Sequence, residues 1–120
     1  MKKITLAPSM TPPFSVQLEV MDAALPYTWD LYADRSDVST WNPPKLQSGS
    51  QDAWCNCPSG WPARGHILQW QVAVQTFDSE PVKVRIRATL KDAQGRLQQA
   101  EGMATVSQST PRFRFALEVV

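Results

Sequence analysis

Apolar and polar residues alternate along most of the chain, and this alternation predicts β-strands. Every second residue is apolar in each such segment, which gives a strand one apolar face and one polar face. The pattern is clear over five segments: 14–20, 27–33, 68–74, 82–90 and 113–119. A sixth segment, 96–106, shows it more weakly. Early prolines allow at most a short edge strand at 4–6.

Turn residues separate these segments and suggest how the strands connect. Asp78 to Pro81 can form a turn between 68–74 and 82–90, so we expect these two segments to form a hairpin. Gly95 suits a backbone turn with positive φ. No segment has the apolar spacing of an amphipathic helix. The expected fold class is therefore all-β, a single antiparallel β-sandwich of immunoglobulin-like or jelly-roll type over residues 1–120.

Residues 34–65 interrupt the strand pattern. This stretch is rich in Ser, Asp, Asn, Pro and Gly and has no apolar period, so we expect a long irregular loop here. Connections longer than about 15 residues are uncommon in compact domains unless they are functional or contain a short element. The best candidates for such an element are 36–41 and 52–55. Three tryptophans in the loop argue against simple disorder.

Composition restricts the class of protein further. The chain has 120 residues, 42% of them apolar and 19% charged, with a net charge of +1. No apolar run approaches the ~20 residues of a membrane-spanning helix. The near-zero charge gives no general attraction to nucleic acid or anionic lipid, so we expect neither as a partner. We find no signal peptide at the N-terminus and expect a soluble, cytoplasmic protein.

Cys55, Cys57 and His66 are the residues that suggest chemistry, as zinc or copper ligands or as a thiol nucleophile with a base. A structural zinc site needs four ligands, and the Cys-x-Cys spacing differs from the usual Cys-x2-Cys. A disulfide between the two cysteines would close a strained ring. We therefore expect two reduced thiols, no metal and no cofactor. Familiar catalytic motifs are also missing, so we expect no enzymatic activity.

The loop also carries the side chains of a binding site. Flat aromatic faces beside directional hydrogen-bonding groups suit a sugar or a peptide. The candidate partner-binding residues are Trp41, Trp54, Trp61, Asn56 and Arg64. The alternative is that the tryptophans fold back and close one end of the sandwich.

Basic residues alternate on two predicted strands, at Lys83, Arg85 and Arg87 and again at Arg112 and Arg114. If these strands are neighbours, the five cations form one patch. Glu101 and Glu118, or an anionic ligand, would then compensate the charge. We expect an ordinary solvated sheet face. Scattered carboxylates such as Asp30, Asp34 and Asp37 lack the spacing of a calcium loop.

The sequence thus favours a non-enzymatic binding or assembly module that presents the Trp/Pro/Cys-rich loop to a protein or glycan. The alternative is a small thiol or metal-binding protein that uses Cys55, Cys57 and His66. Unpaired sheet edges would also permit a homo-oligomer.

Overall fold

The computed structural model describes residues 2–21, 25–35, 44–58 and 64–120, and every regular element in them is a β-strand. The strands are β1 (Lys2–Ile4), β2 (Ser15–Met21), β3 (Tyr27–Arg35), β4 (Lys45–Ser50), β5 (Trp54–Asn56), β6 (His66–Val74), β7 (Val82–Lys91), β8 (Leu97–Val106) and β9 (Arg112–Val119). None of these residues belongs to a helix, so they include no helix that could cross a membrane.

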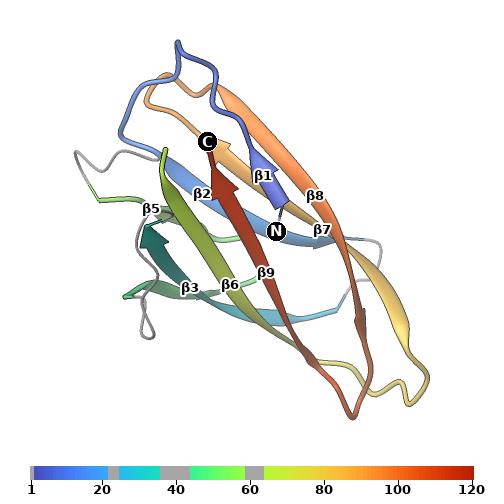
Figure 1. Cartoon of the computed structure of the whole chain (residues 1–120). Coiled ribbons are helices and arrows are strands. Elements are labelled where there is room, and N and C mark those ends of the chain that lie inside the picture. The colour runs from blue at the N-terminus through green and yellow to red at the C-terminus, as the bar shows by residue number, and fades with distance from the viewer. Residues whose placement is uncertain (1, 22–24, 36–43, 59–63) are drawn as a thin grey trace.

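Two sheets pack face to face, which confirms the predicted all-β sandwich (Figure 1). The five-stranded sheet has the order β1-β9-β6-β3-β4, and the four-stranded sheet has the order β5-β2-β7-β8. All neighbours are antiparallel except β1 and β9, which run parallel and bring the two ends of the chain together (Figure 1). The predicted edge strand at 4–6 is thus placed two residues earlier, at 2–4.

The apolar rows predicted from the sequence form the core. On β3, Tyr27, Trp29, Leu31 and Ala33 are all buried; the matching row of β6 lies beside them in the same sheet, and those of β2 and β7 come from the other sheet. The rings of Trp70 and Phe115 lie 6.2 Å apart between their centroids, in a tilted contact. Burial of these rows excludes water from the interior and is the main stabilising contribution.

The predicted hairpin between 68–74 and 82–90 is wrong. β6 pairs with β3 and β9, whereas β7 pairs with β2 and β8 in the other sheet. The connection 75–81 is long enough to cross the ~10 Å between packed sheets. Within it, the backbone N–H of Asp78 donates to Oγ1 of the buried Thr76, 3.2 Å away.

A true hairpin joins β7 to β8, and Asp92 organises its turn. The Asp92 carboxylate accepts hydrogen bonds from the backbone N–H groups of Gln94 and Arg96, at 3.0 and 2.8 Å. Gly95 has a φ of 80°, as its position in the sequence predicted. In the paired strand, Gly102 lies where an added Cβ would be 2.7 Å from the Phe115 ring, so the two sheets approach closely there.

The stretch predicted as an irregular loop contains two strands. β4 pairs with β3 and forms an edge of the five-stranded sheet, while β5 pairs with β2 and forms an edge of the four-stranded sheet. β5 overlaps the element expected at 52–55, whereas the element expected at 36–41 lies outside the described residues. β4 has only one large apolar side chain, Leu46, and this is why periodicity did not indicate it.

Candidate functional site

Strand β5 displays two of the candidate binding residues on the outer face of the four-stranded sheet. Trp54 lies opposite Gln17 and Asn56 lies opposite Ser15 on β2. Ser15 Oγ donates to Oδ1 of Asn56 at 2.9 Å, and Gln17 Nε2 donates to the carbonyl of Asp52 at 2.6 Å. These bonds fix the short edge strand against β2.

The Trp54 side chain extends across this face toward β7. It is 36% exposed, and the ammonium of Lys91 lies over the ring, 4.3 Å from its centroid. A cation over an indole is attracted by the negative ring face and restricts the ring's orientation. The backbone of Trp54 is also held from β4, where Gln47 Nε2 donates to the Trp54 carbonyl at 3.4 Å. The Trp54 ring is thus a partly exposed aromatic surface whose orientation is restricted by Lys91.

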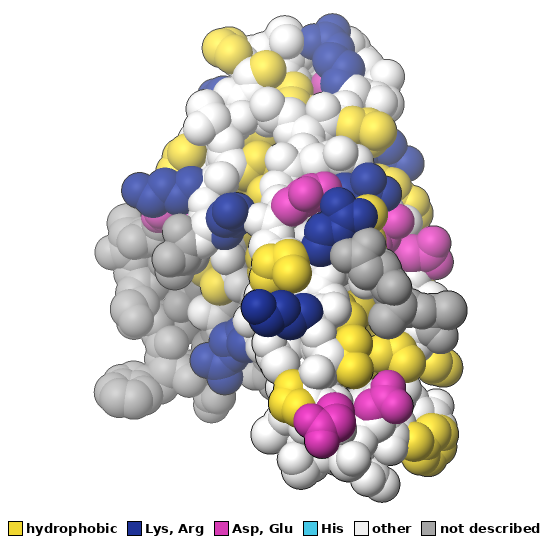
Figure 2. Space-filling model, turned by 90° about the vertical axis from the view of Figure 1, so that its right-hand side faces the viewer, with side chains coloured by type: hydrophobic (Ala, Val, Ile, Leu, Met, Phe, Trp, Pro, Cys, Tyr) yellow, Lys and Arg dark blue, Asp and Glu magenta, His cyan; other side chains and the backbone are white. Residues whose placement is uncertain are grey.

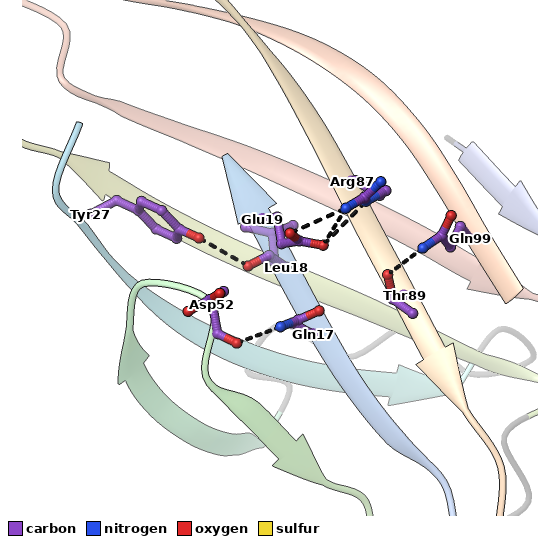
Figure 3. A network of polar contacts seen from close by, with 8 residues as sticks. All are labelled: Gln17, Leu18, Glu19, Tyr27, Asp52, Arg87, Thr89 and Gln99. Carbon is purple, nitrogen blue, oxygen red and sulfur yellow. Dashed lines mark hydrogen bonds and ion pairs between the residues drawn. The ribbon is translucent and has the colours of Figure 1, made fainter. Parts of the chain in front are cut away.

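Polar groups surround this ring across the sheet. The register places Gln17, Thr89 and Gln99 in one row with Trp54, and Gln99 Nε2 donates to Oγ1 of Thr89 at 3.3 Å (Figure 3). In the next row the Arg87 guanidinium donates to both carboxylate oxygens of Glu19, at 3.0 to 3.2 Å (Figure 3). This outer face thus carries hydrogen-bonded polar side chains beside the Trp54 ring, and on β8 it also exposes the apolar side chains of Leu97 and Met103.

The two cysteines point the other way, into the core. Cys55 is 1% exposed and Cys57 is 5% exposed, and neither is in a disulfide. Burial raises the pKa of both thiols, and for Cys57, where the neighbouring Cys55 adds to the effect, the pKa rises to about 12. Both groups therefore remain protonated near neutral pH, whereas nucleophiles and metal ligands are thiolates.

His66 begins β6, in the sheet that does not contain the cysteines. It lies opposite Val119 on one side and Arg35 on the other. Among residues 2–21, 25–35, 44–58 and 64–120, no group of three His, Cys, Asp or Glu side chains is arranged to hold a metal ion.

The remaining candidate residues are not gathered around Trp54. Trp41 and Trp61 lie outside the described residues, so the idea that they close one end of the sandwich stays a prediction. Arg64 is exposed, and its Nη2 donates a hydrogen bond of 2.7 Å to the carbonyl of Leu6. This bond links the start of β6 to the N-terminal segment. Lys91, 37 residues from Trp54, is the site residue that sequence reasoning missed.

The basic residues do not form one patch, because their strands are not neighbours. Lys83, Arg85 and Arg87 lie on β7, whereas Arg112 and Arg114 lie on β9 of the other sheet. On the face drawn in Figure 2, lysine and arginine side chains are dispersed among polar and apolar ones. The two acidic residues expected to compensate these charges also lie in different sheets. Glu101 lies opposite Arg87, and Glu118 pairs with Lys3 at 3.8 Å.

Comparison with protein-family models, with curated proteins and with solved structures finds no match to this chain.

Proposed function

We propose that this protein is a non-enzymatic binding or assembly module, and that its partner, a protein or a glycan, contacts the outer side of β5. The observation that carries the proposal is the Trp54 ring, which is partly exposed and held between a strand edge and the Lys91 ammonium. An exposed indole offers a large rigid contact area at little cost in conformational entropy.

Asn56 and the adjoining polar row supply the directional part of recognition. The Asn56 amide uses Oδ1 to accept from Ser15, and its side chain is exposed. Sites that bind sugars or peptides commonly combine an apolar surface with a few convergent polar groups. Trp41 and Trp61, which flank this strand in the sequence, remain proposed members of the same site.

The alternative function, thiol or metal chemistry at Cys55, Cys57 and His66, has less support. Its two sulfurs are buried and protonated, and Cys55 and His66 belong to different sheets. Metal analysis together with thiol titration of the folded protein tests it. Bound metal at one equivalent, or thiols that react rapidly at pH 7, would favour it over the binding module.

The binding proposal is tested with Trp54→Ala and a matched control, Phe77→Ala. Phe77 is also aromatic and is 81% exposed, but it lies in the connection between β6 and β7. Wild type and both variants are applied to a glycan array and used as bait for partner proteins, and each captured ligand is then purified and titrated.

A ligand retained by the wild type and Phe77→Ala but bound at least about tenfold more weakly by Trp54→Ala supports the site, because buried aromatic contacts often dominate binding. If Trp54→Ala binds every ligand as the wild type does, β5 is not the contact surface and the proposal fails.

A further inference from the structure

The outer face of the five-stranded sheet, on the opposite side of the molecule from Trp54, contains a hollow of about 340 Å³. Two rows of outward side chains line it. In one row Arg112, Ala73 and Thr28 lie side by side on β9, β6 and β3, and in the next row Arg114, Gln71 and Asp30 do the same. The small Ala73 side chain leaves the floor low between these neighbours.

Two guanidiniums form one wall of this hollow. Arg112 and Arg114 are both exposed, and neither side chain forms an ion pair or hydrogen bond within the described part of the chain. Their positions two residues apart on one strand place the side chains on the same face, with Cα atoms about 6–7 Å apart. A single carboxylate between them can accept from both, and such charge-assisted bonds are stronger than neutral ones.

The acidic residue of the hollow is already engaged. The Asp30 carboxylate pairs with the Lys45 ammonium at 3.6 Å and accepts a short hydrogen bond from Ser48 Oγ. Its charge is therefore compensated from β4, on the far side from the arginines. The arginine wall is left with a net positive charge.

A second hollow, of about 470 Å³, continues the first toward the end of the strands and shares Thr28, Ala73 and Arg112 with it. Together they form one groove with Arg112 near its middle. The lining combines apolar side chains with the amides of Gln71 and Gln75 and the hydroxyls of Thr28 and Ser50, and Gln71, Gln75 and Ser50 are exposed. Hydroxyl and amide groups match a ligand rich in hydroxyls.

We propose that this groove binds an acidic oligosaccharide. A uronate carboxylate lies between Arg112 and Arg114, and hydroxyl groups of the same and adjoining sugars bond to Gln71 and Thr28. The volumes fall in the range of about 300–1,000 Å³ typical of small-molecule sites. This site is separate from the proposed contact surface on β5, because the two lie on outer faces of different sheets.

The test titrates tetragalacturonate into the protein by calorimetry, with neutral maltotetraose and the acidic peptide tetraglutamate as comparison ligands. We expect tetragalacturonate to bind at one equivalent and to bind at least about tenfold more tightly than either comparison ligand. The double variant Arg112→Gln/Arg114→Gln should weaken this binding at least about tenfold, since it removes both charge-assisted contacts. Ala73→Leu should weaken it similarly by filling the floor while leaving the charge unchanged.

Two controls separate site binding from general attraction. Lys83→Gln removes a charge from the outer face of the other sheet and should change the affinity less than about twofold, because exposed charges at long range are screened. Trp54→Ala should leave it unchanged, so failure of the β5 proposal is distinguishable from failure here. Thermal melting verifies that each variant folds. If Ala73→Leu does not fold, the arginine double variant tests the groove without it.

Three results would overturn the proposal. The first is an absence of tetragalacturonate binding. The second is tetraglutamate binding as tightly as tetragalacturonate, which would indicate an acidic peptide site. The third is an equal loss of affinity in Lys83→Gln and in the arginine double variant.

Discussion

The inner and outer faces of the segment Trp54 to Cys57 carry opposite kinds of chemistry. On the inner face, Cys55 and Cys57 are buried in the core, and burial raises the pKa of both thiols. On the outer face, Trp54 and Asn56 are exposed beside the polar row of β2. Four consecutive residues thus divide into a closed pair and an open pair.

This difference follows from the two-residue period of an extended chain. Residues separated by one position point to the same side, so the Cys-x-Cys spacing, unlike Cys-x2-Cys, sends both sulfurs in one direction. Here that direction is inward, because Cys55 is flanked by the buried row of β2 and joins the same core cluster as Val16. The cysteines that suggested metal or thiol chemistry therefore pack as small apolar side chains.

The largest expected contrast comes from placing a carboxylate on each face. Cys55→Asp should destabilise the protein by more than about 3 kcal/mol or prevent folding, since it buries an unpaired charge or a carboxyl group without hydrogen bonds. Asn56→Asp, one residue away, should change stability by less than about 0.5 kcal/mol. Urea denaturation of both variants measures the difference. Equal effects would show that the two faces are not distinct.

High pH should weaken the inner face selectively. The pKa of Cys57 is about 12 in the folded protein against an ordinary value of 9.0, so between these values the unfolded chain loses the proton and the folded chain keeps it. Stability is therefore retained below pH 9 and declines as the pH rises toward 12. Between pH 8 and pH 11 we expect a loss of about 2–3 kcal/mol from this thiol.

Cys57→Ala isolates that contribution. This variant lacks the thiol, so its stability should fall less than that of the wild type over the same pH range, when both are followed by urea denaturation. If the two proteins lose stability in parallel, the Cys57 thiol titrates normally and the inner face is open to solvent.

The contrast between the faces also shows how far the sequence could be interpreted. Apolar alternation predicted the strands that build the core, because each, like 68–74, has a row buried on one side only. It missed β4, whose residues 45–50 are half-buried or exposed on both faces and are held chiefly by pairing with β3. Edge strands with little apolar burial leave no such pattern.

Pairing and site composition were harder to predict than strands. Segments 68–74 and 82–90 are neighbours in sequence but belong to different sheets, since the connection between them crosses the sandwich. The composition of the candidate site was hard to predict for the same reason, because it depends on which strands are neighbours in a sheet. Trp54 was recognised from its residue type, but its contact with Lys91 depends on the order β5-β2-β7, which no local pattern contains.

On the outer face, loss of the indole should cost a moderate amount of stability. Trp54→Ala removes the contact with Lys91 and the covered part of the ring, so we expect about 2 kcal/mol of destabilisation in thermal or urea unfolding. By contrast, Trp70→Ala, at a ring that is 1% exposed, should cost about 3–5 kcal/mol. A cost for Trp54→Ala as large as that for Trp70→Ala would make Trp54 a core residue and remove it from the binding surface.

The smallest expected effect concerns the charge over the Trp54 ring. Lys91→Met keeps most of the side-chain length but removes the ammonium, so stability should change by less than about 1 kcal/mol, the range of an exposed cation–π contact.

Tryptophan fluorescence tests the contact itself. In a Trp41→Phe/Trp61→Phe background, the described tryptophans other than Trp54, at positions 29 and 70, are buried. Fluorescence quenching then reports on Trp54. Iodide, an anion attracted by Lys91, should quench less in Lys91→Met, whereas quenching by neutral acrylamide should stay the same or increase. Equal iodide quenching with and without Lys91 would mean that the ammonium does not lie over this ring in solution, and the outer face would then lack the contact that orients its aromatic surface.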